Sequence, residues 1–313
     1  MSGMDDTERR VSPSYRVFNG WPTALAPIAG APLAIGLAWV YGLPIHAVAS
    51  FAVIGLATGL GVTIGLHRLL THRSFTTFRP VERLLMVLGC MAGQSSPFLW
   101  IANHRTHHQH SDRDGDPHSP YVWNGRRLGL LRGFWHAHFG WLCGYGSGYS
   151  AYIVSDLTRR PDLAWIDRHW LPLYLLGLAL PAAAGALIGG TAYDALIGFL
   201  WGGLLRHFVA LNATFAVNSV THVWGSRPYE TADESRNNLL IGVLAFGEGW
   251  HNNHHAFPYS ARHGFRWWQP DMTWCAIWLM ERLGLAWRVK RPVVATALVR
   301  PPRSPISSPS PLG

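Results

Sequence analysis

The sequence predicts an all-α integral membrane protein with four transmembrane helices in two hairpins and a cytoplasmic helical cap that carries a histidine-rich metal site. Three observations lead to this fold class: long uncharged segments, an uneven distribution of arginine, and histidines repeated at helical spacings. An uncharged apolar stretch of roughly 20 residues is long enough to cross the hydrocarbon core of a bilayer. The 313-residue chain is therefore expected to form one domain with a membrane half and a cytoplasmic half.

Four apolar segments define the predicted hairpins. We expect transmembrane helices over residues 24–43, 47–66, 171–190 and 194–217. The first hairpin should turn at Pro44–His46 and the second near Gly189–Asp194, where glycine and aspartate favour chain reversal. These helices belong to a domain over residues 21–291, which we expect to lie between a disordered lead (1–20) and a disordered tail rich in proline and serine (292–313).

The distribution of charge predicts how the chain lies in the membrane. The two hairpin turns contain no lysine or arginine, whereas Arg68–Arg168 holds twelve arginines and the region after His222 holds ten basic residues. By the positive-inside rule, both termini and the histidine-rich side are cytoplasmic. This topology, with contacts to membrane lipids, explains the net charge of +9 better than nucleic acid binding, because Lys290 is the only lysine. Three cysteines without a CxxC motif fit a reducing cytoplasm.

Two further apolar segments are too short or too interrupted to cross a bilayer. Val81–Ala102 is interrupted at Gln94–Pro97, and Asn238–Trp250 is the second such segment. We expect both to lie in the plane of the membrane surface and to lead into histidine motifs. The fourth helix should continue past the bilayer to His222. At 1.5 Å per residue it rises about 24 Å from Arg206, which would then lie near the interface.

Nine of the 17 histidines occur in patterns suited to a pair of metal ions. HxxHH, present twice, places three imidazoles on one helix face. HxxxxH, the spacing of His67 and His72, does not fit one face of an ideal helix. That pair is therefore expected where a helix ends or unwinds. Imidazole is a ligand for iron, copper, zinc and nickel. The predicted ligands are His67, His72, His104, His107, His108, His222, His251, His254 and His255.

The other eight histidines are not predicted to bind metal. His46 belongs to the outer turn, and His169 and His263 are expected at the surface. Metal-bound imidazole usually donates its second N–H to a carboxylate or carbonyl group, so acids near the motifs are candidates for that role. An ordinary solvated loop charge is the alternative for each acid. The candidates to support the ligands are Asp112, Asp114, Asp116, His118 and Glu248.

A nitrogen-rich two-metal site beside a membrane predicts oxidation of a lipid chain. Neutral imidazoles add no charge, so the metals stay electrophilic, and dioxygen activation requires redox-active metal with open positions. A membrane lipid hydroxylase fits these features as well. A non-enzymatic metal carrier is a third hypothesis, but it predicts ionisable residues along a path inside the membrane helices.

Four stretches carry a resemblance to a known family: GVTIGLHRLLTHRSF (61–75), WIANHRTHHQHSDRDGDPH (100–118), NATFAVNSVTH (212–222) and GEGWHNNHH (247–255). With them the chain resembles the membrane-bound fatty acid desaturases, most closely the bacterial type of the stearoyl-CoA (acyl-CoA) Δ9 desaturase family, over roughly residues 20–290. The resemblance implies a site of two ferrous ions that uses dioxygen and two external electrons to form a cis double bond. It also implies that the nine histidines are the ligands and that Asn218 reaches one iron through water.

The resemblance further implies an acyl tunnel that bends at the reactive carbons. Gln94, Trp100 and Thr214 match the residues that build the bend, which predicts cis geometry at Δ9. Gly55 and Phe215 are further expected tunnel positions. A bulky residue that closes the tunnel in the family aligns with Gly55, which predicts a deeper tunnel that accepts longer chains.

The expected substrate is a long-chain saturated acyl-CoA, and the expected partner is a separate electron donor. Basic residues that meet the CoA phosphates in animal relatives are missing at Ile101–Asn103 and Cys143–Gly146, so an acyl-lipid or acyl-carrier-protein substrate stays open. The donor would be a ferredoxin, rubredoxin or cytochrome b5-type protein with its reductase, and the arginine-rich face could dock an acidic one. Zinc can replace iron at such a site in overproduced protein.

Overall fold

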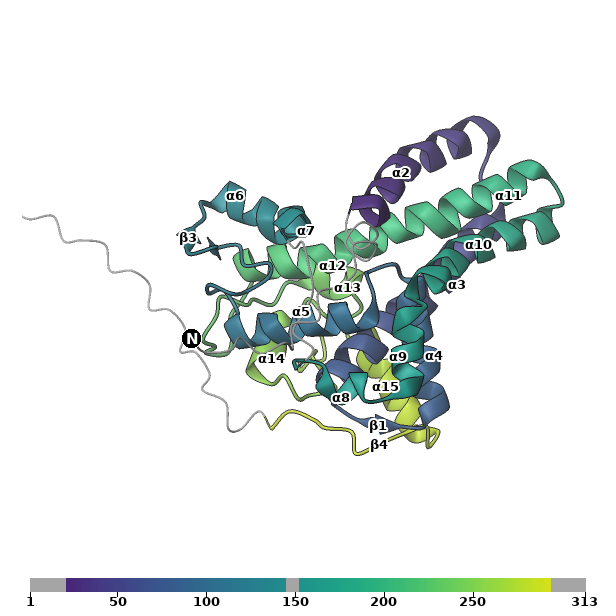
Figure 1. Ribbon diagram of the computed structural model, residues 1–313. Helices are drawn as coiled ribbons and strands as arrows, with labels where there is room; N and C mark the ends of the chain where they lie inside the picture. The colour runs from purple at the N-terminus through teal and green to yellow at the C-terminus, as the bar shows by residue number, and fades with distance from the viewer. Residues whose placement is uncertain (1–20, 145–151, 294–313) are drawn as a thin grey trace, which may run out of the picture.

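The computed structural model describes residues 21–144 and 152–293, so the predicted lead and nearly all of the predicted tail lie outside the described residues. Figure 1 shows a helical arm joined to a larger body of short helices and loops. The arm contains α2 (Trp21–Tyr41), α3 (Ile45–Leu60), α10 (Trp170–Gly189) and α11 (Ala192–Gly198). The described chain is mostly helical, as predicted, with two short strand pairs in the body.

The two predicted hairpins are present, and their turns lie together at one end of the arm. Between α2 and α3, Gly42 adopts a φ of 86°, a conformation that glycine tolerates at little cost. Between α10 and α11, Thr191 and Asp194 form a capping box that begins the second helix of the hairpin. The Tyr193 hydroxyl donates to the Gly42 carbonyl over 2.7 Å, which joins the two turns.

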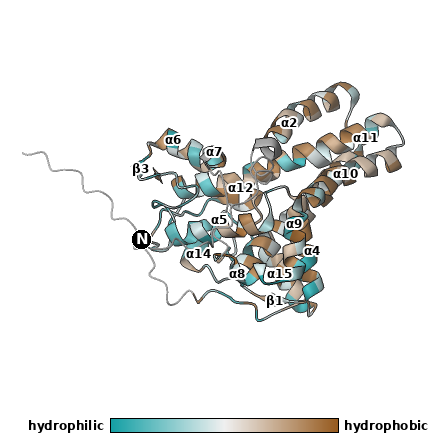
Figure 2. Ribbon diagram, in the orientation of Figure 1, coloured by the Kyte–Doolittle hydropathy of each residue, from teal (hydrophilic) through white to brown (hydrophobic). Residues whose placement is uncertain are grey.

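Three helical segments are long and apolar enough to cross a membrane: Ile45–Thr71, Trp170–Gly189 and Ala192–Val223. The first of them joins α3 to the π-helix η1 (Gly61–Thr71), and the last joins α11, η3 (Phe199–Leu205) and α12 (Arg206–Val223). Within α2, Leu25–Tyr41 is an apolar stretch shorter than these three segments, and the first predicted span stays a prediction. Figure 2 shows hydrophobic residues prevailing in the arm and hydrophilic ones frequent around α14 and β3.

Arg206 is buried inside the protein, whereas its level relative to a membrane stays a prediction. Its side chain is buried between helices and donates to the carbonyl of Gly202 over 2.7 Å and to the Thr58 hydroxyl over 3.0 Å. Weaker contacts reach the carbonyls of Met91 and Gly177, both at 3.4 Å. Arg206 therefore links α12 to three neighbouring elements instead of reaching water.

The body is built from short helices connected by loops. Its helices are α4 (Arg79–Met91), α5 (Pro97–His110), α6 (Leu130–Trp135), η2 (His136–Gly140), α7 (Trp141–Gly144), α8 (Ser155–Thr158), α9 (Pro161–Arg168), α13 (Leu239–Leu244), α14 (His251–Ala256) and α15 (Met272–Arg282). Strand β1 (Thr76–Thr77) pairs antiparallel with β4 (Ala286–Trp287), and β2 (Val122–Trp123) pairs antiparallel with β3 (Arg126–Arg127). The chain breaks between α4 and α5 as predicted, and the Ser96 hydroxyl caps the new helix.

Glycines let η1 pack unusually close to α4, which fixes the position of the first histidine motif. A Cβ atom at Gly61 would lie 2.4 Å from the backbone nitrogen of Gly89, and one at Gly65 would lie 2.9 Å from the Leu85 Cβ. Neither distance is tolerable between packed atoms, so only glycine permits this approach. The polar end of a membrane helix is thereby held against the body, where the other histidines lie.

Candidate metal centre

The π-helical winding of η1 explains how HxxxxH can direct two imidazoles to one point. In an α-helix, residues five apart point about 140° away from each other. A π-helix bonds residue i to residue i+5, and here the amide of His72 donates to the carbonyl of His67 over 3.1 Å. The two rings consequently lie on one face, with centroids 4.8 Å apart. The pair was expected where a helix ends or unwinds, and η1 does end at Thr71, with His72 following it.

Four elements bring the nine predicted ligands together. Helix α5 carries three of them, α14 carries three, η1 and its C-terminal residue carry two, and α12 carries one. They divide into two sets, within each of which the candidate ligand atoms lie within 4.8 Å of one another. The sets are His67, His72, His104, His108 and His254, and His107, His222, His251 and His255.

The distances between ring nitrogens within each set fit ligands of one ion. In the five-histidine set, the Nε2 atom of His108 lies 3.1 Å from that of His104 and 2.9 Å from that of His254. In the four-histidine set, the Nε2 atom of His251 lies 3.0 Å from those of His222 and His255. Two nitrogens bound to one ion at about 2.1 Å and at right angles lie roughly 3.0 Å apart.

In the four-histidine set, carboxylates contact the Nδ1 atoms of three rings, on the side away from the facing Nε2 atoms. Asp116 lies 3.0 Å from His107, and Asp112 lies 2.9 Å from His222. Asp233, which the sequence analysis did not identify, lies 2.7 Å from His255. Such contacts orient a ligating imidazole and fix its tautomer, because an ionised carboxylate can only accept a hydrogen.

These contacts leave unprotonated nitrogens facing one another. Burial would raise the pKa of the Asp116 carboxyl, but the His107 ring holds that pKa below its ordinary value. For Asp233 the effect of burial is likewise overcome by His255, which lowers the pKa of the carboxyl. In the tautomer in which His107 and His255 donate from Nδ1 to these carboxylates, their Nε2 lone pairs face each other across 3.4 Å. Two facing lone pairs repel unless a cation lies between them, so this set suits a bound metal ion.

Four further rings favour the neutral form that binds metal. Burial lowers the pKa values of His104, His108, His251 and His254 well below their ordinary range, and the neighbouring imidazoles lower them further. Neutral imidazole is the ligating form, whereas a protonated ring cannot bind a cation. The donor set therefore fits two metal ions that prefer nitrogen, and iron is one of them.

A buried carboxylate, Glu248, supports the five-histidine set. Its Oε2 atom lies 2.7 Å from Nδ1 of His67 and 3.1 Å from Nδ1 of His263. Its Oε1 atom accepts from Arg68, which is fully buried and also contacts Asp271 at 2.9 Å. Burial would raise the pKa of Glu248, but the Arg68 guanidinium and the adjacent rings hold it well below its ordinary value. The negative charge thus remains where it can orient His67.

An apolar cavity of about 430 Å³ reaches the histidines. Its lining includes His67, His104 and His251, together with Asn218 of α12. Apolar side chains of α3, α12 and α13 form most of the remaining wall. The cavity therefore suits a hydrocarbon chain that passes the candidate metal ions.

Three residues predicted to bend an acyl chain are joined in this wall. The Gln94 amide donates to the Thr214 hydroxyl over 2.7 Å, and the Trp100 indole donates to the Gln94 oxygen over 3.2 Å. Gly55 also lines the cavity, as predicted. Phe215 is not among the lining residues, because its ring is buried against Phe139 and Trp141.

Comparison with known proteins now identifies the family. Residues 43–288 match the family model described as fatty acid desaturase. The chain belongs to the fatty acid desaturase family. The resemblance seen in the histidine motifs is thereby confirmed, and the chain is an oxidoreductase of the membrane.

Relatives in this family differ in the carrier of the acyl chain. A hex-5-enoyl-[acyl-carrier protein] acetylenase of Moorena producens (strain JHB) is 41% identical over 270 residues, covering 85% of this chain and 84% of that protein. An sn-1 stearoyl-lipid 9-desaturase of Anabaena variabilis is 39% identical over 251 residues, or 77% and 85% of the two chains. An icosanoyl-CoA 5-desaturase of Limnanthes douglasii is 39% identical over 252 residues, or 79% and 65%.

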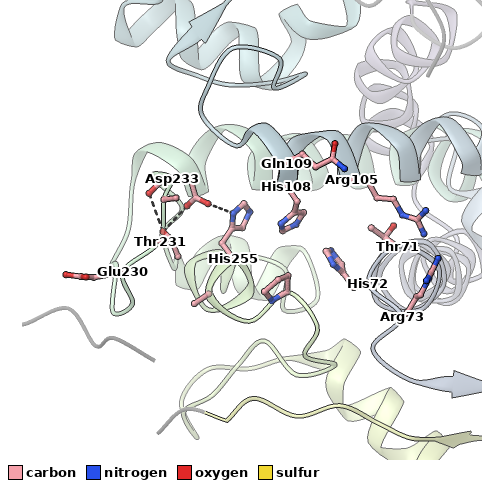
Figure 3. Close-up of a pocket in the computed structure, with 13 residues that line it drawn as sticks. Thr71, His72, Arg73, Arg105, His108, Gln109, Glu230, Thr231, Asp233 and His255 are labelled. Atoms are coloured by element: carbon pink, nitrogen blue, oxygen red, sulfur yellow. Dashed lines mark hydrogen bonds and ion pairs between the residues drawn. The ribbon is translucent and has the colours of Figure 1, made fainter. Parts of the chain in front are cut away.

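A second cavity, which we call the polar basin, also borders candidate ligands and shares no lining residue with the apolar cavity. It has a volume of about 690 Å³, and His72, His108 and His255 line it. Figure 3 shows these three rings along the basin, with Glu230 at one end and Arg73 and Arg105 at the other. The lining is mainly polar, so the basin is suited to water or a soluble partner.

The other predicted supporting residues have mixed outcomes. His118 lies beside Asp116, with its ring centroid 4.4 Å from that of His107, and its supporting role stays a prediction. Asp114 is exposed and accepts from the Gly125 amide, so it is a loop residue and not a partner of a ligand. His263 was expected at the surface, but it is fully buried and its ring lies 4.5 Å from that of His254. The sequence offered no motif spacing that would have indicated His263 or Asp233.

Proposed function

We propose that this desaturase introduces a cis double bond at Δ9 of a long-chain saturated fatty acyl group, using two ferrous ions and dioxygen. The observation that carries this proposal is the pair of histidine sets at the end of an apolar cavity. When bound, the two ions would supply the dioxygen activation needed to remove hydrogen from an unactivated carbon pair. The reaction balances as one –CH₂–CH₂– unit, O₂, two electrons and two protons giving –CH=CH– and two waters.

The protein contributes position and exclusion of water. The apolar wall would hold the chain away from solvent, and the bonded group of Gln94, Trp100 and Thr214 lines the same cavity as the histidines. A chain bent at this point would present two adjacent carbons in the eclipsed arrangement that leads to a cis product. The hydrogen bonds keep the polar groups of the bend satisfied inside an apolar wall.

Expression in a bacterial host fed saturated fatty acids of several lengths tests this function. Mass spectrometry should find a new cis double bond at Δ9 in the host lipids. A bond at another position would keep the chemistry but reject the role of the bend. A hydroxylated product, with a compatible donor co-expressed, would instead identify a hydroxylase.

The chain-length preference should depend on Gly55. A Cβ atom there would lie 3.6 Å from the Arg206 Cγ, an ordinary contact, whereas a larger side chain would fill the inner part of the cavity. In Gly55→Tyr we expect the preference to move to shorter chains, with discrimination of about tenfold for each methylene that no longer fits. Competition between acyl chains of different length, analysed by mass spectrometry, measures this. Gly36→Tyr on α2, where a Cβ meets nothing within 4 Å, is the matched control. An unchanged preference in Gly55→Tyr would reject Gly55 as the tunnel end.

We propose that electrons come from a separate acidic donor that docks over the polar basin, on the cytoplasmic side. The basin exposes the edges of three candidate ligands, and Arg73 on its rim has a side chain 64% exposed. In Arg73→Gln we expect the apparent KM for the donor to rise about two- to fivefold, because an exposed charge contact is lost. Glu230→Gln, at the other end of the basin, should leave that KM unchanged or lower it. Equal donor KM values in wild type and Arg73→Gln would argue against docking here.

A further inference from the structure

We infer that His263, which is not one of the nine predicted ligands, is a positioning residue for the ion of the five-histidine set. It holds the Glu248 carboxylate and the His254 ring, and it thereby keeps His67 and His254 in place around that ion. The inference rests on the proposed function for the presence of two iron ions. It does not depend on the substrate or on the position of the double bond.

The His263 ring is packed beside two ligands of this set. The side chain is fully buried, and its ring centroid lies 4.5 Å from that of His254 and 5.5 Å from that of His67. The Nε2 atoms of these two ligands lie 3.3 Å apart, and Nε2 of His254 lies 2.9 Å from that of His108. His263 itself belongs to neither set, so it can act on the ion only through its neighbours.

The first of these neighbours is the carboxylate of Glu248, one oxygen of which serves two rings. Its Oε2 atom lies 2.7 Å from Nδ1 of His67 and 3.1 Å from Nδ1 of His263. An ionised carboxylate can only accept, so the second contact requires that His263 carries its hydrogen on Nδ1. The Oε1 atom is held separately by Arg68 at 3.0 Å. Without His263, Oε2 would keep His67 as its one imidazole partner, and the carboxylate would be less firmly placed.

The second neighbour is the His254 ring, which has no carboxylate of its own. Among the residues that the structure describes, its buried Nδ1 atom has no hydrogen-bond partner. Metal-bound imidazole usually owes its orientation to a partner of its second nitrogen. Here the His263 ring lies against His254 at an interplanar angle of 35°. Packing between two buried rings therefore takes the place of that partner.

The backbone of His263 is fixed to both elements that carry these ligands. Its amide donates to the Asp271 carboxylate over 2.7 Å, and Asp271 pairs with Arg68 of η1. Its carbonyl accepts from the Asn253 side chain over 2.8 Å, and Asn253 belongs to α14. A supporting side chain is effective when its own position is locked by packing and hydrogen bonds. His263 meets this condition, because η1 and α14 hold it from two directions.

Ferrous iron binding by two variants tests the inference. The full-length protein in nanodiscs is titrated with Fe²⁺ against a chelator, and Mössbauer spectra are recorded with ⁵⁷Fe. His263→Phe keeps a ring but loses the Nδ1 hydrogen. We expect its affinity for one of the two ions to fall about 10–100-fold, with one of two iron signals altered. In His263→Asn the side-chain amide can donate to Glu248, so part of the affinity should return. Wild-type affinity for both ions in His263→Phe would overturn the inference.

His207→Phe is the matched control for a buried histidine. His207 is fully buried, its Nδ1 atom lies 2.9 Å from the Tyr174 hydroxyl oxygen, and it belongs to neither set. This variant should unfold at a lower temperature but keep both iron affinities. An equal loss of iron in His207→Phe and His263→Phe would contradict a positioning role, because it would reflect general instability. A wild-type protein that binds fewer than two ferrous ions would instead reject the proposed function.

Discussion

Replacing His108 by alanine should abolish desaturation and lower the bound iron from two ions per chain to one or fewer. The Nε2 atom of His108 lies within 3.1 Å of two other candidate ligands, so its loss removes a central donor of the five-histidine set. Metal binding depends on the number and placement of ligands, and no nearby side chain replaces this one. Metal analysis of the purified variant, together with product analysis, measures both effects.

His169→Ala is the matched control for this prediction. His169 is half-buried, its Nδ1 atom lies 2.8 Å from the Trp165 carbonyl, and it belongs to neither set. The control should keep two ions and wild-type activity. If His108→Ala retained two tightly bound ions and full turnover, the assignment of the five-histidine set would be wrong.

Glu248→Gln should weaken both the fold and the metal centre. The amide cannot neutralise the buried Arg68, which would keep only Asp271, and it no longer fixes the orientation of His67. Breaking a buried ion pair costs about 3 kcal/mol or more, and losing a partner of a metal ligand costs about 10–100-fold in metal affinity or activity. Thermal unfolding and iron titration of the purified variant measure these two losses separately.

Glu281→Gln is the comparison for Glu248→Gln, because Glu281 pairs with Arg291 at a partly exposed position on α15. Loss of this ion pair should change the free energy of unfolding by less than about 1 kcal/mol and leave iron binding intact. A variant Glu248→Gln that is as stable as wild type and binds iron equally well would show that the carboxylate does not support the centre.

The candidate ligands could be predicted because helical spacing places them. HxxHH on α5 and α14 follows from the geometry of a helix, and the failure of HxxxxH to fit an α-helix correctly predicted a helix end at His72. The hairpins could be predicted equally well, because apolar length and turn residues such as Gly190 are local properties of the chain. Which residues share a helix face follows from their spacing, whatever structure surrounds the helix.

The supporting residues were harder to predict from the sequence, because loops bring them to the site from distant parts of the chain. Asp233 lies 22 residues before its partner His255, in a loop without regular structure. Nothing in the spacing distinguishes it from Asp114, which was predicted and proved to be exposed. His263 appeared to belong to a polar surface loop, but the buried charge of Glu248 holds it inside.

Arg206 illustrates a different limit. The sequence predicted a place near the interface for Arg206, and sequence alone cannot reveal a set of oxygen acceptors supplied by four different elements. In the fold, Gly202, Thr58, Met91 and Gly177 supply those acceptors, so the guanidinium stays buried beside the cavity. Contacts between helices, rather than the local pattern, determine where this residue lies.

Iron titration coupled to product analysis tests the central claim most directly. Metal-free protein in liposomes would receive zero to three equivalents of Fe²⁺, followed by dioxygen, a reduced donor and a labelled saturated acyl substrate. The account predicts that cis-Δ9 product rises until two equivalents are bound and then levels off, and that two equivalents of Zn²⁺ give none. Full activity with one equivalent of iron, or with zinc, would contradict a function based on two iron ions held by these histidines.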